Sequence, residues 1–186
     1  MRRFRNEVPL DFERAYRRLV AATSLQSLQV GQAVAREFGD SLLTAGFVSD
    51  EHVDFICRAL LDPVVAKQPG LDELILALYI DREKLSESQL ERFFGCLANS
   101  FGHLAAENLA FVIGDFIARV ASPERAVELL LDMTAKATSL QALAGVFLGL
   151  DILRKHPAGM SLNAIESAVK TAEERSAQLK NEANSV

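Results

Sequence analysis

SPERAVELLLDM, residues 122–133, is the stretch that decides the fold class of this chain. Ser122 is a residue type that caps helix N-termini, and Pro123 suits the first helical position, where its missing N–H would have no partner. Apolar residues then follow at helical spacing, namely Ala126, Leu129, Leu130 and Met133. This spacing is typical of one buried helix face, so the stretch predicts an amphipathic α-helix.

The same arrangement recurs after three other serines, Ser49, Ser86 and Ser161. Along the chain the four serines are separated by 37, 36 and 39 residues. In each segment the residues four, seven, eight and eleven positions after the serine are all apolar. The regular separation predicts a repeated unit of two helices in about 37 residues, which is a size typical of helical-pair repeats.

More strongly apolar helices are expected between these segments, starting near Gly70, Leu104 and Ser139. They contain three internal glycines, Gly114, Gly145 and Gly149. Glycine costs a helix about 1 kcal/mol relative to alanine, so these positions predict a close approach of a neighbouring helix.

The pattern as a whole predicts an all-α fold, because alternating strand patterns and Asn-Gly or Asp-Gly hairpin turns are missing from the sequence. We expect about eight or nine helices, stacked as antiparallel pairs in an α-solenoid of the HEAT or tetratricopeptide kind. The residue patterns that define those families are not found, so an irregular multi-helix bundle stays open as the alternative. Residues 1–186 are expected to form one domain, with a flexible basic tail over 1–8 and a frayed end over 181–186.

Composition is that of a folded chain, with 49% apolar and 24% charged residues and a net charge of −5. No secretory signal is apparent, and the longest apolar run, residues 142–150, is far shorter than the roughly 20 residues of a membrane span. Cys57 and Cys96 are the only cysteines, which suggests free thiols in a reducing compartment. We therefore expect a cytoplasmic protein that does not bind membranes.

Motifs that would carry chemistry are missing from the sequence. It has no nucleophile elbow, phosphate-binding loop, dinucleotide fingerprint, zinc or di-iron motif, or EF-hand loop. We therefore expect no catalytic residue, no metal site and no cofactor. His103 and Glu107 lie one turn apart and could act as a base pair or half a metal site, but local pairing at a helix junction is the favoured interpretation.

Three further side chains carry expectations that a structure can test. His52 occupies the third position of a predicted helix, where an ordinary surface residue is expected. Cys57 stands eight residues after Ser49, a position that is apolar in all four segments, and it is expected to be a buried structural thiol. Cys96 stands ten residues after Ser86, a position that is apolar in some segments and polar in others, and it is expected to be partly exposed. Whether it has a chemical role is left open.

Charge is unevenly distributed along the chain. Residues 1–18 carry a net charge of +3, which leaves −8 for the rest. Arg14, Arg17 and Arg18 lie within one helical turn and could contact an anion or an acidic partner, because guanidinium groups bind carboxylate and phosphate in a bidentate manner. A solvated helix face is the simpler interpretation. Nucleic-acid binding is not expected, because the chain is acidic and shows no helix-turn-helix pattern.

Three functions remain open from the sequence. We expect a protein-interaction module, such as an adaptor, a regulatory subunit or an inhibitor, with an unidentified protein partner and no catalytic activity of its own. A homodimer is left open. The alternative is an all-α regulator that responds to a small ligand or a nucleic acid, because helices rich in phenylalanine can enclose an apolar pocket. An enzyme that uses dispersed acidic residues is the third hypothesis.

Overall fold

The computed structural model describes residues 10–22, 26–101, 107–157 and 161–184, with the side chains of residues 107 and 108 excepted. Within these ranges the chain forms nine α-helices, two short 3-10 helices and no strand, so the all-α prediction is confirmed. The α-helices are α1 (Phe12–Ala21), α2 (Ser27–Ala45), α3 (Asp50–Leu61), α4 (Leu71–Ile80), α5 (Glu87–Ser100), α6 (Glu107–Val120), α7 (Pro123–Lys136), α8 (Leu140–Lys155) and α9 (Leu162–Asn184). The 3-10 helices are η1 (Val65–Lys67) and η2 (Arg82–Lys84).

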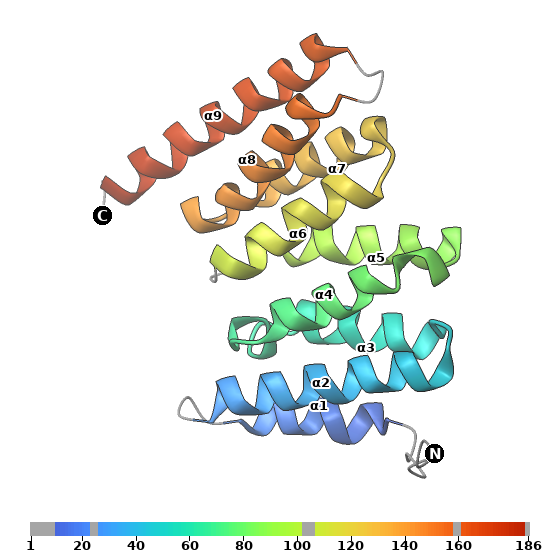
Figure 1. Cartoon of the computed structure of the whole chain (residues 1–186). Coiled ribbons are helices and arrows are strands. Elements are labelled where there is room, and N and C mark those ends of the chain that lie inside the picture. The colour runs from blue at the N-terminus through green and yellow to red at the C-terminus, as the bar shows by residue number, and fades with distance from the viewer. Residues whose placement is uncertain (1–9, 23–25, 102–106, 158–160, 185–186) are drawn as a thin grey trace.

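The helices lie in two layers, stacked from α1 and α2 at one end to α8 and α9 at the other (Figure 1). One layer consists of α2, α4, α6 and α8, each in contact with the next. The other consists of α3, α5, α7 and α9, with α1 against α3 at its start. Among the described residues, every pair of helices in substantial contact is adjacent or next but one in the chain. The tail predicted over 1–8 and residues 185–186 lie outside the described ranges, whereas residues 181–184 belong to α9.

Three of the four predicted serine caps, Ser49, Ser86 and Ser122, are the N-cap residues of their helices. At the start of α5, the N–H of Gln89 donates to Oγ of Ser86 (3.2 Å) and the N–H of Ser86 donates to Oε1 of Gln89 (2.9 Å). This reciprocal pair is a capping box, which satisfies two N–H groups that the helix itself leaves unpaired. Ser122 accepts from the N–H of Arg125 at the start of α7, and Ser161 directly precedes α9.

The core lies between the two layers and contains the helix faces that the sequence predicts. Each of the sixteen apolar positions counted from the four serines is buried or half-buried. Phe116 of α6 is fully buried near the middle of the stack and meets Phe93 of α5 edge to face, with ring centroids 5.2 Å apart. Tyr79 of α4 contacts the same ring at 6.0 Å. The contact with Phe93 joins the two layers, and the contact with Tyr79 joins α4 to α6 within one layer.

The backbones of α6 and α8 are in direct contact at glycine positions. A Cβ atom at Gly145 would lie 2.0 Å from the carbonyl oxygen of Ala110, and one at Gly114 would lie 1.9 Å from the carbonyl oxygen of Gly145. No side chain fits at either position, so the close approach predicted from the internal glycines is confirmed. We call this contact between α6 and α8 the glycine seam.

No helix in the described part of the chain combines the length and the apolar character needed to cross a membrane.

Candidate functional site

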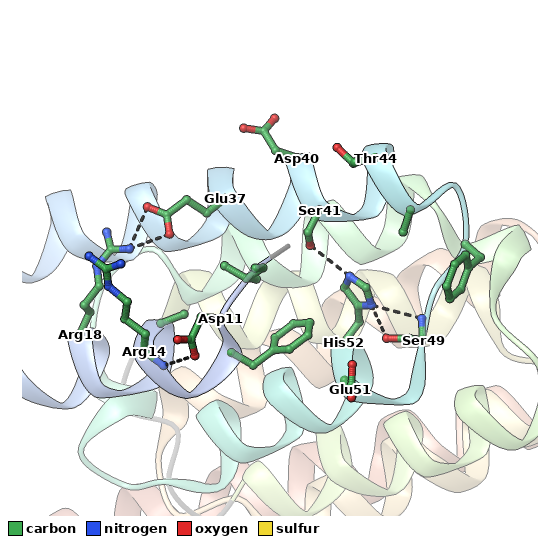
Figure 2. A pocket seen from close by; sticks show the side chains of 15 residues that line it. Asp11, Arg14, Arg18, Glu37, Asp40, Ser41, Thr44, Ser49, Glu51 and His52 are labelled. Atoms are coloured by element: carbon green, nitrogen blue, oxygen red, sulfur yellow. Dashed lines mark hydrogen bonds and ion pairs between the residues drawn. The ribbon is translucent and has the colours of Figure 1, made fainter. Parts of the chain in front are cut away.

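A groove of about 940 Å³ lies at the N-terminal end of the stack, between α1, α2 and the start of α3 (Figure 2). It exists because α1 and α2 differ in length. Helix α1 has 10 residues and α2 has 19, and the C-terminal end of α2 extends beyond the start of α1 (Figure 1). The side of α2 that α1 leaves uncovered forms one wall of the groove.

The α2 wall follows from the amphipathic pattern of that helix. Its buried face, which includes Val34, Phe38 and Leu42, packs into the core. Its groove wall is formed by side chains at helical spacing, namely Glu37, Asp40, Ser41 and Thr44. Apolar surface continues at the end of the helix, where Ala45 and Phe47 also line the groove and Phe47 is 58% exposed.

The α1 wall combines apolar and charged residues. Asp11 caps the helix by accepting the N–H of Arg14 at 2.9 Å, and Phe12 is half-buried between this helix and the core. Arg18 reaches across to α2, where its Nη1 donates to both carboxylate oxygens of Glu37 at 2.6 and 2.8 Å. This ion pair links the two walls and neutralises both charges at one end of the groove.

The three predicted arginines line one smaller pocket along α1, of about 510 Å³, but only two of them reach the groove. Arg14 and Arg18 line the groove, whereas Arg17 forms an i,i+4 ion pair with Glu13 at 3.1 Å. Glu13 also binds Arg58 of α3 at 2.6 Å, and the hydrogen bonds from these two guanidinium groups lower the pKa of that carboxyl group. Among the described residues, only Arg14 of the three has no ion pair. A contact role for the three arginines stays a prediction.

His52 forms part of the groove floor, and the expectation of a surface residue is wrong, because only 5% of it is exposed. It occupies the third position of α3, where a capping box usually has Glu or Gln. The N–H of Ser49 donates to Nδ1 of His52 at 3.2 Å, in the way it would donate to such a carboxylate or amide oxygen. The Ser-x-x-His spacing in the sequence is thus the pattern that could have predicted this capping contact.

Hydrogen bonds around His52 define its tautomer. The hydroxyl of Ser41 donates to the carbonyl oxygen of Phe38 at 2.7 Å, so it accepts from the Nε2–H of His52 at 3.1 Å. Nδ1 accepts from the backbone N–H of Ser49, and the hydroxyl oxygen of Ser49 lies 2.7 Å from the same nitrogen. Burial lowers the pKa of His52, in agreement with a neutral ring. Both ring nitrogens are therefore occupied by structural partners, and the ring shapes the floor of the groove.

The expectations for the two cysteines are reversed in the structure. Cys96 is buried, with 6% exposed, and Cys57 is only half-buried. The thiol of Cys96 donates to the carbonyl oxygen of Cys57 at 3.7 Å, which shows that this side of α5 packs against α3. Hydrogen bonding between the two thiols lowers the pKa of Cys57 and, together with burial, raises that of Cys96. Burial of the two cysteines is predicted from the spacing of apolar residues after each serine. That spacing identifies the helix face toward the other layer, but not the face that contacts the neighbouring helix within the same layer.

His103 lies outside the described residues, and Glu107 begins α6 with its side chain undescribed, so the pairing of these two residues stays a prediction. Within the described ranges, no group of three or more His, Cys, Asp and Glu side chains is arranged to hold a metal ion.

No protein-family model matches the chain, and no match is found among curated proteins or among solved structures.

Proposed function

We propose that this protein is a protein-interaction module without catalytic activity of its own, of the adaptor, regulatory or inhibitor type, and that the groove is its binding site. The observation that carries the proposal is the composition of the groove. Exposed aromatic surface at Phe47 lies in the same groove as the carboxylates of Asp40 and Glu51, which form no ion pair within the described residues. Aromatic side chains next to polar groups are typical of protein-binding surfaces.

We further propose that the two layers form an α-solenoid of helix pairs. The regular spacing of the capping serines supports this arrangement. So do arginines that link successive helices of one layer, because Arg92 of α5 binds Asp50 of α3 at 3.2 Å and Arg125 of α7 binds Glu91 of α5 at 2.8 Å. Solenoids present extended surfaces to their partners. A cytoplasmic location is part of the same proposal.

Binding of a small ligand is the alternative function, and the size of the groove favours it. A volume of about 940 Å³ falls within the range of roughly 300–1,000 Å³ that is usual for small-molecule sites. A thermal-shift screen of the full chain against a metabolite panel tests this alternative, because a ligand that binds only the folded state raises Tm. A hit whose shift disappears in a variant with a filled groove would replace the proposal of a protein partner.

The test of the main proposal fills the groove without changing its charge. A displayed library of peptide fragments from the native host is selected against the full chain and against Ala45→Trp, in which an exposed lining residue becomes bulky. Ala135→Trp is the matched control, because Ala135 is exposed on α7, far along the stack from the groove. We expect peptides that bind the wild type and Ala135→Trp but not Ala45→Trp. If no peptide separates these two variants, the groove is not the binding site.

A further inference from the structure

We propose that the occupant of the groove is a basic peptide segment of a separate protein, in which an arginine or lysine is followed or preceded by an aromatic or large aliphatic side chain. This inference rests on the proposed function and names the chemistry of the partner. It is carried by the charges that the fold leaves unneutralised in the groove and by the apolar surface among them.

The balance of charge in the groove is negative. Arg18 and Glu37 neutralise each other, which leaves the carboxylates of Asp11, Asp40 and Glu51 against the single guanidinium of Arg14. With His52 neutral, the lining residues have a net charge of −2. A cationic side chain is therefore attracted to the groove, and a phosphate-bearing partner is repelled.

The charged groups are separated along the groove. The cations of Arg14 and Arg18 lie at one end, whereas Glu51 lies toward the other, beside the uncharged Ser49 and His52, with Asp40 on the rim formed by α2 (Figure 2). The free carboxylates of Asp40 and Glu51 come from two different helices, α2 and α3. Both are exposed and form no ion pair with another described residue. A cation bound near this end would meet acidic groups without breaking a contact that holds the fold.

Apolar surface defines the second requirement on the partner. Phe47 follows α2, lines the groove and is 58% exposed, although phenylalanine has no polar group that would favour exposure. Phe12 adds half-buried ring surface on the α1 wall. An apolar side chain next to the cation can bury this surface, which a simple cation or a purely polar peptide would leave in water.

The test measures binding of a labelled peptide in which arginine and phenylalanine alternate, by fluorescence anisotropy with the full chain at low salt. We expect Asp40→Asn combined with Glu51→Gln to weaken binding roughly fivefold to tenfold, because each exposed ion pair contributes only modestly to the affinity. Phe47→Ser should also weaken binding. The matched control is Glu166→Gln combined with Glu173→Gln, which removes two exposed carboxylates of α9 and should leave the affinity unchanged.

Two control peptides complete the design. A peptide with glutamate in place of arginine and one with serine in place of phenylalanine should both bind at least about tenfold more weakly than the probe. Equal binding of the glutamate peptide would overturn the claim of a basic partner. So would a loss of affinity in the α9 control as large as that in the groove variant, because binding would then follow net charge alone.

The chain itself contains Arg2, Arg3 and Arg5, which have the same chemistry. Replacing all three with serine should leave the affinity for the probe unchanged if the partner is a separate protein. A gain of more than about threefold would show competition from the same chain and would overturn the inference. If the library selection yields groove-dependent peptides that are acidic or uncharged, the proposed function stands and the basic partner is rejected.

Discussion

The imidazole Nε2 of His52 lies 3.1 Å from the hydroxyl oxygen of Ser41, and this contact joins the start of α3 to α2 beneath the groove. The ring can make it only as a donor, because Ser41 uses its own proton on the carbonyl oxygen of Phe38. Nδ1 is at the same time an acceptor for Ser49. A second proton on the ring would sit on Nδ1, where it would face the backbone N–H of Ser49, which is also a donor.

The first prediction is a loss of stability below neutral pH. Because the pKa of His52 is lowered in the folded state, the unfolded chain binds a proton more readily. The contribution of His52 to stability is therefore fully present above the unfolded pKa of about 6.5 and is lost as the pH falls below it. For one group the slope cannot exceed about 1.4 kcal/mol per pH unit. Urea unfolding at several pH values between 7.5 and 5.5 measures it.

His52→Gln is the control for this prediction, because glutamine can accept the N–H of Ser49 in a standard capping box and does not titrate. Its free energy of unfolding should change less over this pH range than that of the wild type. Parallel curves for the two proteins would mean that the pH dependence comes from other groups.

A second prediction concerns the glycine seam. Gly145→Ala forces a Cβ atom to within 2.0 Å of the carbonyl oxygen of Ala110, so α6 and α8 must move apart. We expect a loss of about 1–3 kcal/mol in the free energy of unfolding, as for other overpacked sites. Gly95→Ala is the matched control, because nothing lies within 4 Å of its added Cβ and the helix gains up to about 1 kcal/mol. The same sign of change in both variants would contradict the prediction.

The third prediction is the order in which the thiols react. Cys57 is half-buried and its pKa is lowered, whereas Cys96 is buried and its pKa is raised. Because the thiolate is the reactive form, iodoacetamide should modify Cys57 before Cys96 in the native chain. Mass spectrometry of the digested protein follows both sites over time. Cys57→Ser should show slow modification only, and faster labelling of Cys96 in the wild type would refute the assignment.

The sequence predicts the helices well because caps and apolar spacing report local interactions. Ser86 and Gln89 form their capping box within four residues, so nothing distant is needed to predict it. The burial of Cys96 depends on α3 as the neighbour within the layer, and the spacing within α5 does not contain that information. The prediction that His52 is a surface residue is wrong because its burial depends on α2, which packs over the start of α3.

The groove shows a further limit of prediction from sequence. It arises from the difference in length between α1 and α2 and from their side-by-side placement. The arginines of α1 are visible in the sequence, but their charge predicts neither of these two features. The sequence groups Arg14, Arg17 and Arg18 as a candidate contact site by their shared helical turn, and it gives no indication that Glu37 neutralises Arg18. Asp40 and Glu51 show no distinctive pattern, because isolated acidic residues occur on most exposed helix faces.

The contacts between neighbouring helices also determine how this chain gains its structure. Because, over the residues that the structure describes, substantial contacts join only helices that are adjacent or next but one, few of these contacts need distant parts of the chain to meet. Chains with such low contact order fold rapidly, since little loop-closure entropy must be overcome before contacts form. The glycine seam lies toward the C-terminal end of the stack and α1 at the opposite end, so helix α1 can detach while α6 and α8 remain docked. The wall of the groove that α1 provides can then open without unfolding the rest of the stack, and a bound partner would oppose that opening.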